Sequence, residues 1–182
     1  MFEFIADRRA LDFVATVSER RTAQQEQLRT PADLVAWVRA SGLVDDQVTV
    51  DGARLRDARQ LRESMFGLVS ALIDGAAPDP ADLQAVNAAA ARPRPVLDLE
   101  PDGTLRRRGD LDAVLAELAT DALDLAGSPD RRALHWCADT TCTRPFVDRS
   151  RGQRRRWCGM KGCGDRAKAA AYRQRRASIA PA

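Results

Sequence analysis

The chain has 182 residues, of which 45% are apolar and 30% charged, a composition typical of a folded globular protein and unlike that of a disordered one. It contains no run of 18 apolar residues, which excludes a transmembrane helix, and residues 1–10 lack the apolar core of a signal peptide. We therefore expect a cytoplasmic location and no membrane partner. The length suffices for one domain of about 100–150 residues and a small module.

Charge is distributed unevenly along the chain. Residues 1–130 contain 15 arginines against 23 acidic residues, a net charge of −8, whereas residues 131–182 carry 14 basic and 3 acidic residues, a net charge of +11. This division predicts two units with different partners, the basic one facing a polyanion. Two alternatives stay open: a basic face that only keeps the module in solution, and binding to an acidic protein or to the chain's own acidic half.

The acidic part predicts a helical domain. Apolar residues recur at helical spacing in five segments, at 8–19, 31–42, 51–74, 79–91 and 110–125. The expected helix starts are at Thr30, Asp79 and Asp110, and the expected helix ends are at Gly42 and Gly75. Ahead of the last helix, Asp102-Gly103 separates two short strand-like runs, which indicates a β-hairpin.

All four cysteines lie in the basic part, in two pairs: Cys137 with Cys142 and Cys158 with Cys163. In a chain expected in a reducing compartment, such pairs more often bind metal than form disulfides. Each pair can supply one edge of a tetrahedron, so we expect one structural Zn²⁺ with these four ligands. The alternatives are two disulfides, an iron–sulfur cluster, or ligation by the single histidine, His135.

The elements around the cysteines complete a fold prediction. Strand-like runs are expected at 134–136, 145–147 and 154–157, followed by a helix from Cys163 to about Arg176. The order of knuckle, hairpin, knuckle and helix resembles a treble-clef finger. We therefore predict an α+β, mostly α-helical fold: a helical N-terminal domain with a small β-hairpin at 1–127, a linker at 128–133, and a treble-clef-like zinc finger at 134–178.

Two sets of residues carry a resemblance to known families. Phe146-x-Asp148-x-Ser150, Arg155-Arg156-Trp157-Cys158-x-Met160-x-x-Cys163-Gly164-Asp165-Arg166-x-Lys168 and Tyr172-x-x-Arg175 resemble the CGNR-type zinc finger. Leu11-Asp12-Phe13-Val14-x-Thr16 and Leu34-x-x-Trp37 are similar to the ABATE domain. The resemblance implies a stress-linked bacterial transcription regulator. The chain departs from the family motifs at Asp165 and Ala15, where the families have Asn.

Duplex DNA is accordingly the expected partner of the finger. In the last helix, Arg166 and Arg173 share a face that fits a major groove, whereas the arginines from Arg149 to Arg156 are expected on backbone phosphates. Trp136, Phe146 and Trp157 are expected in the small core of the finger. The candidate nucleic-acid contacts are Arg149, Arg151, Arg154, Arg155, Arg156, Arg166, Lys168, Arg173, Arg175 and Arg176.

No catalytic constellation is evident, so the chain is not expected to be an enzyme. There is one histidine and no glycine-rich phosphate loop, and Asp148 and Asp165 are interpreted as structural acids. Homodimerisation through the N-terminal helices is a further hypothesis, and the alternative function is a zinc-stabilised module that binds protein or RNA. Four charged residues could line a pocket for a small effector, although surface charges are the preferred interpretation: Asp12, Arg59, Arg62 and Glu63.

Overall fold

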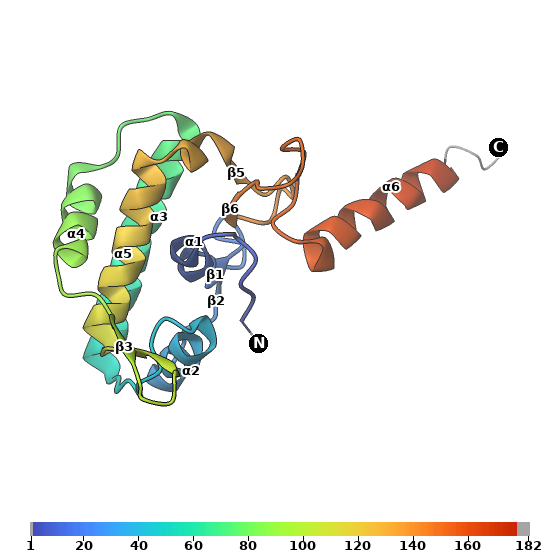
Figure 1. The fold of residues 1–182 in the computed structure, drawn as a ribbon. Helices are drawn as coiled ribbons and strands as arrows, with labels where there is room; N and C mark the ends of the chain where they lie inside the picture. The colour runs from blue at the N-terminus through green and yellow to red at the C-terminus, as the bar shows by residue number, and fades with distance from the viewer. Residues whose placement is uncertain (1, 178–182) are drawn as a thin grey trace.

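The structure is a computed structural model that describes residues 2–177. Its helices are α1 (Arg9–Val14), α2 (Pro31–Ser41), α3 (Gly52–Asp74), α4 (Pro80–Ala90), α5 (Leu111–Gly127) and α6 (Asp165–Ala177). Figure 1 shows α3, α4 and α5 side by side, with α1 and the β5–β6 region on one side and α6 extending away from the body. The predicted α+β, mostly helical class is confirmed.

The strands form three separate antiparallel hairpins within the described residues. Strand β1 (Val17–Ser18) pairs with β2 (Gln25–Glu26), β3 (Val96–Leu99) with β4 (Leu105–Arg108), and β5 (Leu134–Trp136) with β6 (Pro145–Val147). The β3–β4 hairpin confirms the Asp-Gly prediction. Its turn closes with a hydrogen bond from Gly103 N–H to the Glu100 carbonyl (2.9 Å), and Gly103 adopts a φ of +83° that favours glycine.

The predicted helix starts and ends are also confirmed. The Thr30 hydroxyl accepts a hydrogen bond from Asp33 N–H, and the Asp33 carboxylate accepts one from Thr30 N–H in return, which is a capping box. Asp79 and Asp110 likewise accept hydrogen bonds from the first turns of α4 and α5. Gly42 and Gly75 end α2 and α3 in the left-handed conformation.

The helix predicted over 8–19 is wrong in its second half. Helix α1 ends at Val14, and Thr16 turns the chain through a hydrogen bond from its hydroxyl to the Phe13 carbonyl (2.7 Å). The Thr16 hydroxyl in turn accepts a hydrogen bond from the buried Arg62 (3.0 Å). The chain then continues into β1, so these local side-chain bonds override the helical spacing of the apolar residues.

The third strand predicted at 154–157 is absent from the described structure. The buried Asp148 carboxylate instead accepts hydrogen bonds from Ser150 N–H and Arg155 N–H (both 2.8 Å). This holds the chain in a loop, because the amide of Arg155 is used on a side chain and cannot pair with a strand. Part of the segment expected as a linker is also ordered, as the 3₁₀ helix η1 (Pro129–Ala133).

Two apolar clusters hold the molecule together. The larger one lies between α1 and helices α2 to α5, with Phe13, Trp37 and Met65 fully buried. The second lies beneath β5 and β6 and combines the cysteines with residues of the helical domain: Ala6, Leu11, Val69, Leu125, Ala133, Leu134, Cys137, Cys142, Phe146, Val147, Cys158 and Cys163. The finger region therefore shares its core with the helices. No helix in residues 2–177 is both long and apolar enough to cross a membrane.

Candidate metal centre and interdomain contacts

The four cysteines converge on one buried point. Their Sγ atoms all lie within 4.8 Å of one another, and the Cys142–Cys158 and Cys158–Cys163 separations are both 3.7 Å. A tetrahedral ion with metal–sulfur distances of about 2.3 Å separates its sulfurs by about 3.8 Å. The same separations far exceed the roughly 2.05 Å of a disulfide, and all four cysteines are free. The donor set fits a zinc ion.

The crowding of sulfurs shows why this cluster calls for a cation. The neighbouring Cys137 and Cys142 sulfurs, together with burial, raise the pKa of the Cys158 thiol. Burial, followed by the charges of Cys142 and Cys137, raises the pKa of the Cys163 thiol to about 12. Four thiols held this close cannot all lose their protons on their own, whereas a bound divalent cation would offset the repulsion between thiolates.

Polar groups around the cluster orient the sulfurs. Cys158 N–H donates to the Cys137 Sγ (3.4 Å), and Arg166 Nη2 donates to the Cys163 Sγ (3.1 Å). Arg166 also forms an ion pair with Asp139 (2.8 Å), which lies in the first knuckle, the segment between Cys137 and Cys142. A guanidinium that bridges the first knuckle and the start of α6 fixes one relative to the other.

The remaining residues near the cluster have structural positions. His135 lies on β5 with its ring 6.3 Å from that of Phe146, outside the cluster of cysteines. Phe146 is fully buried, and Trp136 packs on Phe66 of α3 with ring centroids 5.7 Å apart. Phe146 and Trp157 thus pack in or against the finger's apolar cluster, as the sequence predicts, whereas the prediction is wrong for Trp136, which is half-buried and packs on the helical domain. Asp148 accepts the backbone hydrogen bonds described above, and Asp165 is exposed in the first turn of α6.

Arg155 joins the finger to the helical domain. Its Nη2 donates to the carbonyls of Ile5 (2.6 Å) and Cys158, and its Nη1 forms an ion pair with Asp7 (2.6 Å). Its guanidinium also lies 4.5 Å from the centroid of the Phe146 ring, and only 22% of the side chain is exposed. This arginine is thus surrounded by partners from both parts of the chain.

The segment that receives Arg155 is itself fixed by Asp12 of α1. The buried Asp12 carboxylate accepts hydrogen bonds from Ile5 N–H (2.9 Å) and Ala6 N–H (3.0 Å). On its other side, the carbonyl of Ala6 accepts a hydrogen bond from Val147 N–H of β6 (3.1 Å). Residues 5–7 are therefore held between α1 and the finger. Burial raises the pKa of Asp12, against the hydrogen bonds that lower it.

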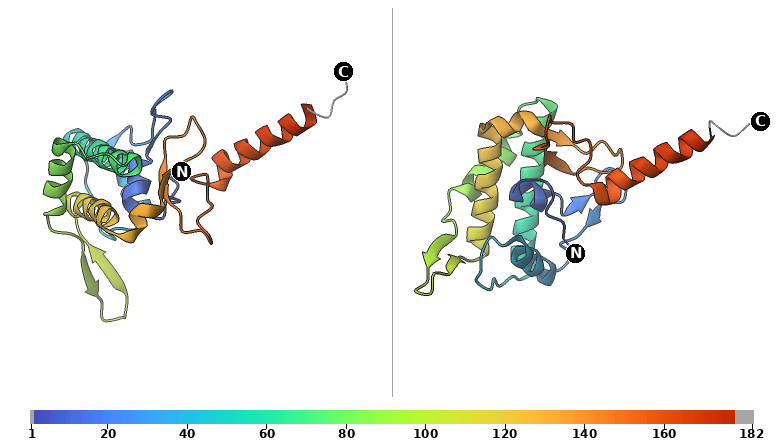
Figure 2. Two further views of the ribbon diagram at one scale, coloured as in Figure 1. Left: turned by 90° about the horizontal axis from the view of Figure 1, so that it is seen from above. Right: turned by 45° about the vertical axis from the view of Figure 1, so that its right-hand side comes forward.

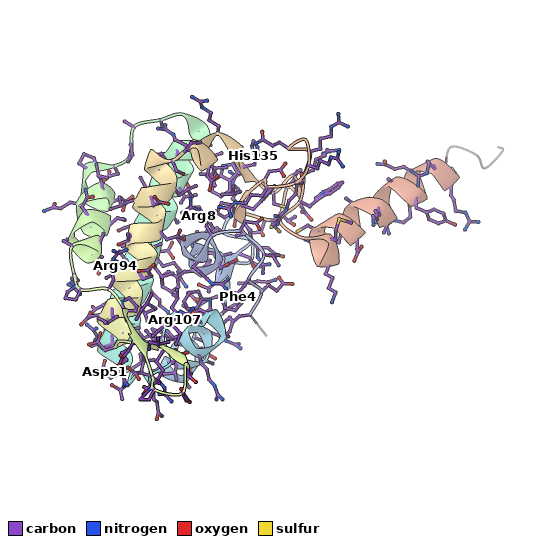
Figure 3. The ribbon with its side chains drawn as sticks, viewed as in Figure 1. Phe4, Arg8, Asp51, Arg94, Arg107 and His135 are labelled. Atoms are coloured by element: carbon purple, nitrogen blue, oxygen red, sulfur yellow. The ribbon has the colours of Figure 1, made fainter. Side chains whose placement is uncertain are left out.

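Further ion pairs connect the two parts. Arg144 of the finger pairs with Glu3 (2.5 Å). Arg8, labelled in Figure 3 beside α5, pairs with Asp130 of η1 (2.9 Å), and Arg149 pairs with the same carboxylate (2.7 Å). Part of the positive charge of the finger is therefore paired with the chain's own acidic half. Such pairing is one of the alternatives that the sequence leaves open for the basic part.

Comparison with known families divides the chain into the same two parts, the helical body and the finger. Residues 7–129 match the ABATE family model, described as a putative stress-induced transcription regulator. The chain belongs to the ABATE family. Residues 133–176 match the CGNR zinc finger, so the α+β body is the ABATE domain and the cysteine cluster lies in the CGNR finger. No curated protein matches the chain. Neither family description names an enzymatic activity.

Of the four charged residues suggested for an effector pocket in the ABATE domain, Arg59, Arg62 and Glu63 lie together around Glu26, whereas Asp12 lies apart from them. Arg62 is buried, with 3% of its side chain exposed, and its Nη2 pairs with Glu26 (2.6 Å) while its Nε pairs with Glu63 (2.9 Å). Arg59 donates to the Leu28 carbonyl (2.9 Å), and Asp12 is used on the N-terminal segment. The interpretation as surface charges is wrong for Arg62 and for Asp12, which are both buried. The buried Thr16 and the half-buried Glu26 supply the partners of Arg62, and Ile5 N–H and Ala6 N–H supply those of Asp12.

The ten candidate nucleic-acid contacts of the CGNR finger differ in how their side chains are held. Arg149, Arg155 and Arg166 are paired within the molecule. Arg149 and Arg166 are nevertheless exposed, as are Arg151, Arg154, Arg156, Lys168, Arg173, Arg175 and Arg176, and the guanidinium groups of Arg156 and Arg176 lie over the rings of Trp157 and Tyr172. The sequence could not show these differences, since all ten residues occur in one basic, motif-rich segment.

Proposed function

We propose that this protein is a zinc-dependent DNA-binding regulator, in which the CGNR finger binds duplex DNA and the ABATE domain supports the finger. The observation that carries the proposal is α6, a helix of 13 residues that extends away from the body with its basic side chains exposed (Figures 1 and 2). A helix in this position has the diameter and the charge to enter a major groove.

The basic side chains occupy about half of the circumference of α6. At 100° per residue, Lys168, Arg173, Arg175 and Arg176 fall on one half, and Ala167, Ala170, Ala171 and Gln174 fall on the other. The basic half would face phosphates and base edges. Residues of both halves, among them Lys168, Ala170 and Arg173, line an open cleft of about 760 Å³ toward Ala138 and Trp157.

Zinc would supply the rigidity that this arrangement requires. We propose Cys137, Cys142, Cys158 and Cys163 as its ligands, because their sulfurs have the separation of a tetrahedral site. Cys163 lies two residues before the first residue of α6, so a fixed metal centre fixes the direction of the helix. The ion would be structural, since four thiolates leave no position for a reactive water.

The paired arginines have a different role in this proposal. Arg155 is taken up by Ile5, Asp7 and Cys158, so we assign it to interdomain contact and not to DNA. Arg166 is committed to Asp139 and Cys163. Arg173 is the clearest candidate for base readout, because it is exposed and has no recorded ion pair within residues 2–177.

Binding to duplex DNA at several salt concentrations tests the proposal. If about five cations contact phosphate, the logarithm of the binding constant should fall against that of salt with a slope of roughly −4 to −5. Arg173→Ala should cost about 1–3 kcal/mol on a selected site and little on scrambled DNA. The matched control is Arg39→Ala, which removes an exposed arginine from α2 of the ABATE domain and should change neither value.

The same experiment separates the alternative, a finger that binds protein or RNA. Absence of binding to duplex DNA at low salt would overturn the proposal, and preferential binding to single-stranded RNA would favour the RNA alternative. Equal losses on selected and scrambled duplexes for Arg173→Ala would remove base readout by α6 and leave phosphate contact only.

A further inference from the structure

The β3–β4 hairpin carries an apolar surface that has no role in the proposed function. Four of the seven large apolar side chains exposed in the described chain lie on it, namely Val96, Leu97, Leu99 and Leu105, with 65, 63, 69 and 45% of their surface exposed. Figure 2 shows this hairpin projecting from the helices. Three of these side chains, Leu97, Leu99 and Leu105, gather on one face, and such clustering indicates an interaction surface.

The two faces of the hairpin differ in character. The strand register places Leu97, Leu99 and Leu105 on one face, together with Arg107, and places Val96, Asp98 and Arg108 on the other. On the charged face, Arg108 pairs with Asp98 (2.9 Å) and with Glu100 (2.7 Å), so these charges satisfy one another. The leucine face has no such partner, and at Leu97 it opens onto a cleft of about 530 Å³ that Leu43 also lines.

The outer edge of β4 is already occupied. Asp45 N–H donates to the Arg107 carbonyl (2.8 Å), and Arg107 N–H donates to the Asp45 carboxylate (2.7 Å). Figure 3 labels Arg107 at this position, between the hairpin and α2. Because both backbone groups of Arg107 point away from β3, its pair with Leu97 is a non-hydrogen-bonded pair of the ladder.

The outer edge of β3 is consequently free. In an antiparallel ladder the two kinds of pair alternate, so Leu97 and Leu99 both direct their N–H and C=O groups away from β4. Within residues 2–177 the structure records no hydrogen bond to these four groups. An edge strand with free backbone groups and apolar side chains is a template for pairing with another strand.

Two prolines limit the register of any such pairing. Pro95 and Pro101 are two residues away from Leu97 and Leu99 along the strand, so their backbone groups face the same outer edge of β3. Neither proline has an N–H to donate. If two copies of β3 pair antiparallel around Leu97, then Leu99 of each copy meets Pro95 of the other. If they pair around Leu99, then Leu97 meets Pro101. Only a pairing centred on Asp98 sets Leu97 against Leu99 and gives the outward C=O groups of both residues an N–H donor.

We propose that β3 pairs with β3 of a second copy of this chain, antiparallel and about a two-fold axis at Asp98, to form a four-stranded sheet. The two leucine faces then join into one surface that carries six leucines and the Arg107 of each copy. The Asp98 side chains of the two copies would face each other, and each keeps its own Arg108. Repulsion between them weakens the dimer. The inference does not depend on what the finger binds.

Cysteine cross-linking of the full-length, zinc-loaded chain tests the register. Residues facing each other in a non-hydrogen-bonded antiparallel pair have Cα atoms about 4.5 Å apart, within the range of a disulfide. Asp98→Cys should therefore give a disulfide-linked dimer under mild oxidation. Asp102→Cys is the matched control, because Asp102 is also an exposed aspartate of the hairpin but lies in its turn. In the proposed pairing, residue 102 of one copy would be about 25 Å from residue 102 of the other, too far for a disulfide.

Sedimentation of the unmodified chain over a range of concentrations tests the dimer itself. We expect a reversible monomer–dimer equilibrium, and we expect Leu99→Arg to remain monomeric with an unchanged circular dichroism spectrum, since this side chain is 69% exposed. A monomer at every concentration would overturn the proposal. Equal rates of cross-linking for Asp98→Cys and Asp102→Cys would overturn it as well, because no register would then be preferred.

Discussion

The ABATE domain and the CGNR finger are stabilised in different ways. The ABATE core is a continuous apolar cluster between helices, with large side chains such as Trp37 and Phe13 at its centre. Apart from its cysteines, the finger buries little more than Leu134, Phe146 and Val147. A module of this size cannot hold a fold by apolar burial alone. The finger therefore depends on two sources of stability, the cysteine cluster and its contact with the surface of the ABATE domain.

Removal of the metal should have the largest effect on this comparison. We expect Cys158→Ser, or chelation of zinc, to unfold residues 134–176, because a structural zinc site supplies on the order of 10 kcal/mol of folding free energy. The ABATE domain should stay folded but become less stable, since Leu11, Val69 and Leu125 lose their cover. Hydrogen exchange resolved by segment measures both effects. A protected finger in metal-free protein would contradict the assignment.

Loss of the interdomain arginine should have a smaller effect on the same contact. Arg155→Ala leaves the carbonyl of Ile5 and the carboxylate of Asp7 without this partner and should lower the free energy of unfolding by about 2–3 kcal/mol. Urea denaturation measures the change. Arg154→Ala removes the exposed neighbouring arginine and should cost under about 0.5 kcal/mol. Equal losses for the two variants would mean that Arg155 has no special role.

The smallest effect should appear in the pH dependence of the ABATE domain. Burial alone would raise the pKa of Glu26, but the hydrogen bonds and charge of Arg62 outweigh it and lower that pKa. Because the folded-state pKa is lowered, this stabilisation is present above the unfolded pKa of about 4.3 and is lost as the pH falls through the folded value. The free energy of unfolding should thus fall more between neutral pH and about pH 3 in the native chain than in the Glu26→Gln variant. An equal difference in both would exclude Glu26 as a contributor.

The sequence predicts the features that depend on local chemistry. Capping by Thr30, the helix end at Gly75, the turn at Gly103 and the pairing of the cysteines each follow from residue type and spacing. The short strands β1 and β2 have two residues each, too few to show a period. Helix α1 is only six residues long, so one hydroxyl at Thr16 suffices to redirect the chain.

The roles of individual arginines could not be predicted. Arg154, Arg155 and Arg156 are consecutive and chemically identical, yet only Arg155 turns inward, toward partners about 150 positions earlier in the chain. Arg62 similarly has the spacing of a helix-surface residue but is buried, because Glu26 approaches it from a strand that has no sequence signal. In both cases the deciding partner is remote, and nothing within a short window of sequence marks it.

The distance along the chain between these partners has a consequence for the order of folding. Residues 3–7 are synthesised before the finger residues Arg144, Val147 and Arg155 that hold them. Closing a loop of this length has a high entropic cost, so contacts within the helices should form first. On the ribosome, the ABATE helices can collapse while residues 3–7 still lack their finger partners. Completion of the chain, metal uptake and capture of that segment would then form one late, concerted step.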